Sequence, residues 1–530
     1  MEALPVRVLV SAPMPQVSSS DTRDEAAFPA PAKSLVRKVA TGAAWMVGVR
    51  MASRTLGLVS TLVVARILVP ADFGLVAMAT AFSQSVNAIS EVGLRDALIR
   101  HPEESNELYD TAFTMQVIRG FLTAGALVAA APFVGGWFGD PRVSSILLVL
   151  AGIAALSGFE NIAIAGFRRN FRFDMEFALQ IAPRVLQVAT AIIAALLLRN
   201  YWALLIAISV SAISRLAATY IVLPHRPRFT LRRWRDLFGF AFWTWACSVA
   251  KIAWERSDAF IIAPALGATA FGLYSLAWEV GWLPVTELIS PAMSALFPGF
   301  AEARRRGDPD ALAPMAVTAF LTLLTVPMTI ALSAAAGPVV AVLLGPSWHA
   351  ARLLVSIAAI YCVVAPFAWV SASLLLASGR VARYFVVILV SAALRIAMLV
   401  YAVRGGSLLV VSWWSIASLV CEAAAFSVVL GMAGEVRLRD GAVAILRSAV
   451  AGAACLLAVW ATGWGWHSAS ATSALSAFVE GTGIGLFAIA VFALFVALLW
   501  LLSGRPEGPE RRVIGLVAGG RTHLAVKLAR

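Results

Sequence analysis

Four charged side chains interrupt an otherwise apolar stretch of the sequence, KIAWERSDAF. Lys251, Glu255 and Asp258 are four and seven residues apart, so a helix would place them on one face. Trp254 falls between them on that face, whereas Arg256 points to another. This face offers polar groups for hydrogen bonds, an indole for stacking, and a carboxylate that could take up a proton or sodium ion. The alternative is an intrahelical ion pair that neutralises itself.

A second chemical signal lies in the first apolar segment, where Arg50 and Arg54 are four residues apart and share a helix face. Two guanidinium groups repel each other there unless an anion lies between them. A phosphate group is one such anion, because guanidinium binds phosphate oxygens in a bidentate fork. A structural salt bridge to Glu91 or to another carboxylate in a helix is an equally good interpretation.

Other ionisable residues also fall inside apolar segments. A charge at the centre of a membrane helix costs about 2.5–3.5 kcal/mol on insertion scales, so it normally faces a cavity or a partner. Glu279 and Trp282 form a second polar and aromatic cluster, and the nearby Pro284 could let that helix bend. The remaining candidates are Arg119, Arg184, Arg215, Arg395, Glu160, Glu287 and Glu422.

The elements that must position these residues are membrane helices. With 60% hydrophobic and 13% charged residues, the 530-residue chain is too apolar for a soluble protein. A hydrocarbon core takes about 20 apolar residues per helix. The sequence predicts an all-α polytopic membrane protein with about 14 transmembrane helices, at 41–65, 72–94, 111–134, 143–166, 176–198, 202–223, 237–262, 270–294, 312–334, 353–377, 384–403, 408–432, 442–462 and 483–502.

The arginines between these segments predict the orientation of the chain. With a cytosolic N-terminus, the inner connections hold seventeen arginines and the outer ones five, as the positive-inside rule requires. Both termini are therefore expected in the cytosol. The formal charge of +13 is explained by these connections, so we expect no nucleic-acid partner. The four cysteines stand singly, without metal or redox spacing.

An internal repeat predicts two similar lobes. ARILVPADFGLVAMA (65–79) aligns without gaps with APALGATAFGLYSLA (263–277), 198 residues further on and six helices later. Because six is even, the lobes would run in parallel and enclose a central cavity, as in alternating-access transporters. A chance match between Ala- and Leu-rich helices is the alternative. The predicted divisions are a disordered tail at 1–40, an N-lobe at 41–223, a basic linker at 224–236, a C-lobe at 237–432, two further helices at 442–502 and a basic tail at 503–530.

Several motifs together resemble a known family. RILVPADFGLVAMA, EVGLRDALIRHPE, NIAIAGFRRNFRF and SDAFIIAPALGATAFGLYSLA are similar to segments of the polysaccharide transporter branch of the multidrug/oligosaccharidyl-lipid/polysaccharide exporter superfamily. The resemblance covers roughly residues 35–440. It implies a flippase that moves undecaprenyl-pyrophosphate-linked oligosaccharide units across the bacterial inner membrane, for assembly of O-antigen, capsule or exopolysaccharide.

On this interpretation, Arg50, Arg54, Arg119 and Arg395 would bind the pyrophosphate. Sugar contacts or ion coupling would fall to Lys251, Trp254, Glu255, Asp258, Glu279 and Trp282. Membrane lipids, a polysaccharide polymerase and a co-polymerase are the other expected partners. No catalytic residue, metal or cofactor is expected, and no GxxxxGK[ST] loop is present to couple ATP hydrolysis. The alternatives are an ion-coupled multidrug exporter of the same superfamily and a membrane polymerase or ligase that acts on lipid-linked glycans.

Overall fold

A computed structural model describes residues 48, 51–91, 93–94, 97–98, 101, 105–169, 172–223, 225–235, 242–289, 314–432, 438–466 and 474–504. All regular secondary structure in these residues is helical, as the composition predicts. The elements are Met51–Ala65, α2 (Pro70–Ser90), α4 (Asn106–Phe138), α5 (Pro141–Gly158), η1 (Ile162–Ile164), α6 (Ala165–Arg169), α7 (Phe173–Leu198), α8 (Trp202–Val222), α10 (Phe242–Gly281), η2 (Val285–Ile289), α12 (Pro314–Ala334), α13 (Ala336–Leu343), η3 (Pro346–Ala351), α14 (Arg352–Ala358), α15 (Tyr361–Ala377), α16 (Val381–Val403), α17 (Leu408–Met432), α18 (Leu438–Ala461) and α19 (Ala474–Leu502).

Within the described residues, eight helices are long and apolar enough to cross a membrane, and ten if each of two bent pairs counts as one span. Helix α10 counts once among the eight, although Gly267, at φ 83° and ψ 173°, breaks it into two helices. Its 40 residues would extend about 60 Å if straight, twice the hydrocarbon core. The break therefore separates the two segments that the sequence predicts at 237–262 and 270–294. The protein is a multi-pass membrane protein.

Each of the other predicted segments also contains helix, but several boundaries differ. The segment expected at 143–166 ends at Gly158, because Asn161 then caps a short 3-10 turn by accepting a hydrogen bond from the Ala163 amide at 3.2 Å. The segment expected at 353–377 is bent by 46° between α14 and α15. Helix α12 continues into α13 through a bend of 72°.

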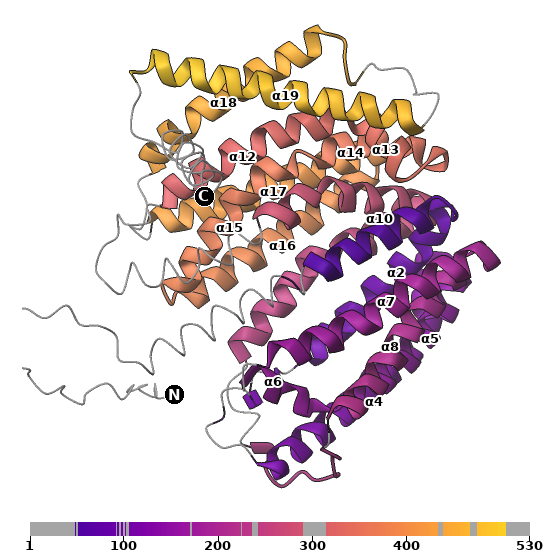
Figure 1. Ribbon diagram of the computed structural model, residues 1–530. Coiled ribbons are helices and arrows are strands. Elements are labelled where there is room, and N and C mark those ends of the chain that lie inside the picture. Colours follow the sequence, from indigo (N-terminus) through magenta and orange to yellow (C-terminus); the bar gives the residue numbers. More distant parts are fainter. Residues whose placement is uncertain are drawn as a thin grey trace, which may run out of the picture.

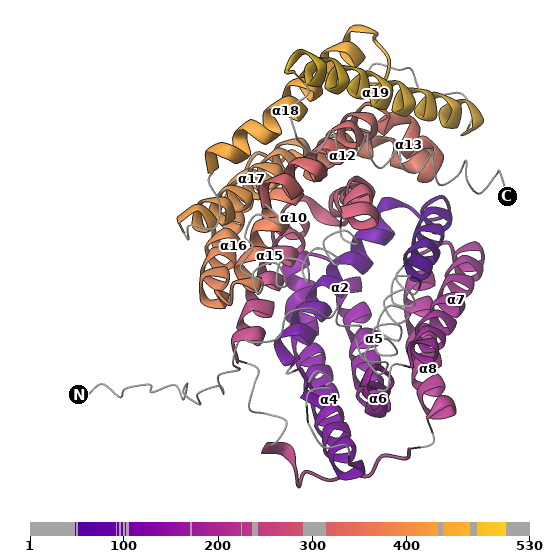
Figure 2. The same ribbon diagram turned by 60° about the vertical axis from the view of Figure 1, so that its left-hand side comes forward.

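The helices form two groups with α10 between them. Helices α2, α4, α5, α7 and α8 lie on one side, and α12 and α14–α17 lie on the other (Figures 1 and 2). Helices α18 and α19 pack outside the second group, against α12. The larger apolar core runs through both groups and includes Leu75, Ile146, Ile262, Tyr361 and Phe426.

The first group meets α10 where α2 crosses the second part of that helix. A methyl group added at Gly74 would overlap the backbone carbonyl of Ala268, and one added at Gly272 would overlap the carbonyl of Pro70. Gly74 and Gly272 are 198 residues apart, as are Pro70 and Ala268. The contact is thus reciprocal at the spacing of the sequence repeat. Glycine is required at both positions because the backbones approach directly.

The 66–69 turn, between the first helix and α2, is covered by residues from α13 and η3. Trp348 in η3 is fully buried, and its indole Nε1 donates a hydrogen bond to the Ala65 carbonyl at 2.7 Å. The edge of its ring packs on Phe73, with 5.3 Å between centroids. Arg66 donates to the Val342 carbonyl. These contacts close that end of the molecule.

Residues 225–230 of the basic connection after α8 are hydrogen-bonded to α4. The buried carboxylate of Asp110 accepts hydrogen bonds from the Arg228 amide and from His225, both at 3.0 Å. The amide of Thr230 donates to Thr114 Oγ1 at 2.9 Å. This half of the predicted linker is therefore held against α4.

Candidate functional site: two adjoining cavities

The polar residues inside the helices converge on a hollow of about 650 Å³ between the first helix, α2 and the second group. We call it the arginine cavity. It is lined by Arg54, Gln84, Trp254, Glu255, Arg256, Asp258, Ser275, Trp278, Glu279, Trp282, Thr286, Tyr361, Arg395 and Leu419. Of the residues predicted for the site, it brings together Arg54, Trp254, Glu255, Asp258, Glu279, Trp282 and Arg395. Arg50 lies outside the described residues.

Arg54 reaches across to the second group. Its Nε donates to Glu287 Oε1 at 2.9 Å and its Nη2 donates to Thr286 Oγ1 at 3.1 Å. Both partners belong to the π-helical turn η2. This turn follows Pro284, which lacks the N–H that would continue a regular α-helix. The pair is partly exposed, at 38% and 27% of the two side chains. Arg54 is thus held by one carboxylate while facing the cavity.

Glu91, the partner suggested for the first arginines, pairs with Arg119 instead. Arg119 and Glu91 do not line the arginine cavity, nor the second cavity that adjoins it. The prediction that Arg119 binds pyrophosphate therefore gains no support from this arrangement.

Arg395 and Asp258 form a buried ion pair between α16 and α10. Arg395 Nη2 lies 2.7 Å from Asp258 Oδ1, with side-chain exposures of 4% and 18%. The guanidinium also donates to Ser418 Oγ at 2.7 Å and stands 4.6 Å from the centroid of the Trp254 ring. Tyr274 donates a second hydrogen bond to Asp258 at 2.9 Å. These bonds occupy most of Arg395, so the geometry favours a structural role over phosphate binding.

Arg256 is a cavity residue that the sequence places on a different face from Lys251. It lines the arginine cavity, and no hydrogen bond or ion pair joins it to the part of the chain that the structure describes. An arginine side chain is long enough for its guanidinium to reach beyond the face on which its Cα lies. Helical periodicity therefore misses it, and its charge within an apolar segment is the signal that could have found it.

Glu279 also lines the arginine cavity, where Arg54 and Arg184 are the cations that act on it. Arg184 on α7 lies over Gly57 of the first helix, and its guanidinium would have to move to admit a larger side chain there. Trp282 stacks on Tyr361 at 4.2 Å between centroids, with planes 17° apart. The cluster predicted around Glu279 and Trp282 thus faces a real hollow.

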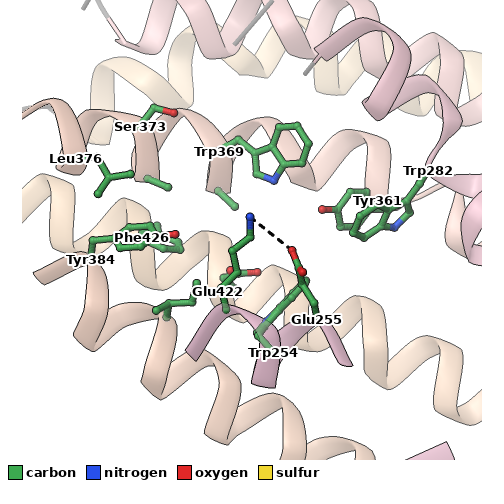
Figure 3. Close-up of a pocket in the computed structure, with 14 residues that line it drawn as sticks. Trp254, Glu255, Trp282, Tyr361, Trp369, Ser373, Leu376, Tyr384, Glu422 and Phe426 are labelled. Atoms are coloured by element: carbon green, nitrogen blue, oxygen red, sulfur yellow. Dashed lines mark ion pairs between the residues drawn. The ribbon is translucent and has the colours of Figure 1, made fainter. Parts of the chain in front are cut away.

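A second hollow of about 340 Å³ adjoins the first (Figure 3). We call it the aromatic cavity. Its lining comes from α10, α15, α16 and α17: Lys251, Trp254, Glu255, Trp282, Tyr361, Ala368, Trp369, Ala372, Ser373, Leu376, Tyr384, Ile388, Glu422 and Phe426. Trp254, Glu255, Trp282 and Tyr361 line both cavities. Lys251 Nζ lies 3.6 Å from Glu255 Oε1. The two residues therefore form an intrahelical ion pair and also line a cavity, so both predictions for them describe the structure.

Several buried donors around the cavities lack acceptors. The indole Nε1 atoms of Trp254, Trp278 and Trp282 make no hydrogen bond within the described structure. A buried donor without a partner costs about 1–3 kcal/mol, so a ligand with acceptor atoms would be bound here at a gain. Within the described residues no group of three or more His, Cys, Asp or Glu side chains could hold a metal ion.

The fold is that of a known class of helical transporters. It superposes on the lipid II flippase MurJ in an inward closed conformation with a TM-score of 0.62 and 15% identity, over 86% of this chain and 99% of the other. An inward-facing multidrug resistance transporter of the MATE family gives a TM-score of 0.57 at 16% identity, over 73% of this chain and 96% of the other. Such identities show the fold alone.

The sequence comparison gives the family. The chain belongs to the family described as polysaccharide biosynthesis protein, whose model matches residues 63–353, more than half of its length. The succinoglycan biosynthesis transport protein ExoT of Rhizobium meliloti (strain 1021) is 28% identical over 60% of this chain and 64% of its own length. The lipopolysaccharide biosynthesis protein WzxC of Escherichia coli (strain K12) is 22% identical over 66% and 72%. The resemblance seen in the sequence motifs is confirmed.

Proposed function

We propose that the protein is a flippase for undecaprenyl-pyrophosphate-linked oligosaccharides in the bacterial inner membrane. The observation that carries the proposal is the arginine cavity, in which Arg54 and Arg256 present guanidinium groups inside an apolar helical bundle. An anionic head group would offset the free energy that burial of these cations costs. The names of the relatives ExoT and WzxC, a transport and a lipopolysaccharide biosynthesis protein, support a glycan cargo.

In this proposal the pyrophosphate lies in the arginine cavity, the sugars lie against the aromatic residues, and the prenyl chain stays in the lipid. Fourteen helices form two parallel six-helix lobes and a C-terminal pair, with both termini in the cytosol. The reciprocal contact of Gly74 and Gly272 at the repeat spacing supports the two lobes. The lobes would rock between inward-open and outward-open states, and the Trp348 contacts would close the outer side in the present state.

The protein would act as a transporter rather than as an enzyme. The polar groups of both cavities belong to membrane helices, whereas a polymerase or ligase needs a base or carboxylate presented outside the membrane. Export of a cationic drug would require a cavity with an acidic excess, but the four carboxylates that line the two cavities are matched by four cations: Glu255, Asp258, Glu279 and Glu422 against Arg54, Lys251, Arg256 and Arg395.

Deletion of the gene tests the proposal through the lipid-linked intermediates. We expect undecaprenyl-linked oligosaccharide to accumulate on the cytosolic leaflet, because synthesis continues while export stops. Loss of the intermediates themselves would indicate an enzyme, and unchanged intermediates with altered drug tolerance would indicate the multidrug exporter. A neighbourhood of glycosyltransferase genes is a simpler observation that would favour the flippase.

A further inference from the structure

The aromatic cavity contains a buried carboxylate on which Arg395 and Lys251 act only at a distance, without an ion pair within the described residues. Glu422 on α17 is 8% exposed and lines this cavity, yet it makes no hydrogen bond or ion pair with the described residues. Lys251, the cation of the same cavity, is engaged by Glu255. Burial of an unpaired carboxylate is costly, so a ligand in the cavity that donates hydrogen bonds to Glu422 would be bound at a gain.

Two side chains whose donors lack acceptors line the same cavity, and a turn of each indole would bring its N–H to the cavity surface. Trp254 Nε1 and Trp282 Nε1 are buried and make no hydrogen bond within the described structure. A ligand that satisfies both kinds of group must donate and accept from neighbouring atoms. Hydroxyl groups do so, since each provides one donor and two acceptor lone pairs. A polyhydroxylated ligand therefore matches the unsatisfied atoms.

The walls of the cavity specify the shape of such a ligand. Trp369 and Tyr384 line it together with Tyr361 and Phe426, and Figure 3 shows these rings arranged around the Lys251 and Glu255 pair. The faces of a pyranose ring carry C–H groups that pack on aromatic faces, while its edge carries the hydroxyls. The cavity volume of about 340 Å³ is near the lower end of the range for small-molecule sites.

The internal repeat shows that these groups are peculiar to the second half of the chain. At the spacing of 198 residues, the α10 side chains of the aromatic cavity correspond to smaller or uncharged residues on the first helix and α2. Lys251, Trp254, Glu255 and Trp282 correspond to Ser53, Leu56, Gly57 and Gln84. Helix formation alone does not need the charged and aromatic set, because the first copy forms helices without it.

We propose that the aromatic cavity is a binding site for one neutral hexose ring of the lipid-linked oligosaccharide, with Glu422 accepting hydrogen bonds from its hydroxyls. The inference rests on the proposed function, because the pyrophosphate in the adjoining arginine cavity brings the sugar to the site. A uronic acid is disfavoured there, since its carboxylate would face that of Glu422. The site thus selects cargo by the charge of a sugar.

Binding measurements on the purified full-length protein test this site with defined lipids. The probes are undecaprenyl pyrophosphate alone and the same lipid carrying one glucose, one galactose or one glucuronic acid. We expect wild type to bind the glucose or galactose lipid roughly tenfold more tightly than the bare lipid, as hydrogen bonds to a charged group provide. Glucuronic acid should add nothing.

Glu422→Gln should abolish the gain from the neutral sugar and leave the affinity for bare undecaprenyl pyrophosphate unchanged. It should also remove the discrimination against glucuronic acid. Trp369→Leu is the second variant, which should lose the neutral-sugar gain through the lost stacking surface. Glu480→Gln makes the same chemical change on α19, away from both cavities, and should behave as wild type.

The outcomes separate the inference from the proposed function. If wild type binds all four lipids equally, or if Glu422→Gln keeps the neutral-sugar gain, the hexose site is wrong while the pyrophosphate site stands. If wild type binds none of the four lipids, the proposed function itself fails.

Discussion

Arg256 is a guanidinium of the arginine cavity that no carboxylate of the described residues neutralises, whereas Arg54 and Arg395 have ion-pair partners. Among these three, Arg256 is therefore the cation most available to an anionic ligand. The other two would have to exchange a protein carboxylate for the phosphate.

The first prediction concerns Arg256→Gln. The variant should bind undecaprenyl pyrophosphate roughly tenfold or more weakly, because a hydrogen-bonded charge pair with the ligand is lost. Its melting temperature in detergent should not fall, since no ion pair of the described protein is broken. Arg142→Gln, which affects a pair with Asp140 outside the cavities, is the matched control. Wild-type affinity in Arg256→Gln would remove this residue from the site.

The second prediction concerns the buried pair of Asp258 and Arg395. Asp258→Asn should destabilise the protein by about 3–5 kcal/mol, because it leaves a buried guanidinium without its counter-charge. Thermal unfolding in detergent measures the loss. The double variant Asp258→Leu/Arg395→Met should recover much of the stability, since it removes both charges together. An undiminished melting temperature in Asp258→Asn would mean that the pair is dispensable for the fold.

At the scale of the elements, the first group makes its closest backbone contact with α10, where α2 crosses the second part of that helix. Their crossing depends on Gly74 and Gly272, where backbone meets backbone and no side chain can move aside. The reciprocity of the contact makes the two glycines equivalent.

The third prediction follows from this equivalence. Gly74→Ala and Gly272→Ala should each lower stability by about 1–3 kcal/mol, the usual cost of overpacking, and by similar amounts. Gly152→Ala on α5 is the control, because nothing lies within 4 Å of the added methyl group. It should be neutral or stabilising, as glycine is a poor helix former. Thermal unfolding of the three variants checks both statements, and a tolerant Gly272→Ala would contradict the crossing.

At the scale of the whole molecule, the closed end over the 66–69 turn depends on one large side chain. Trp348 joins η3 to the first helix through the Ala65 carbonyl and packs on Phe73. If the lobes alternate, this contact must break whenever the outer side opens.

The fourth prediction uses Trp348→Ala to shift that equilibrium. Removing the indole deletes a hydrogen bond and a fully buried ring from the closed state only, so the outward-open state should gain population. A cysteine introduced by Ser275→Cys in the arginine cavity should then react faster with a membrane-impermeant thiol reagent added outside. Trp460→Ala, which truncates a ring that is 60% exposed on α18, is the control. Equal labelling of both variants would argue against a closing role for Trp348.

The sequence by itself determined that the chain forms membrane helices and approximately where they lie. Apolar runs of sufficient length have no other stable arrangement in a bilayer, because every backbone polar group must be bonded within the segment. The same reasoning singled out Glu255, Asp258 and Glu279 as cavity residues, since charges in an apolar helix need a polar surrounding.

Only the tertiary structure decided which of these groups meet. Arg54 pairs with Glu287, which is 233 residues away in the sequence, and not with Glu91. Arg395 pairs with Asp258, which is 137 residues away. Helical periodicity fixes which residues share a face, but the neighbour of that face depends on how distant helices pack. For the same reason the aromatic cavity, which takes Trp369, Tyr384 and Glu422 from three different helices, becomes visible only in the assembled fold.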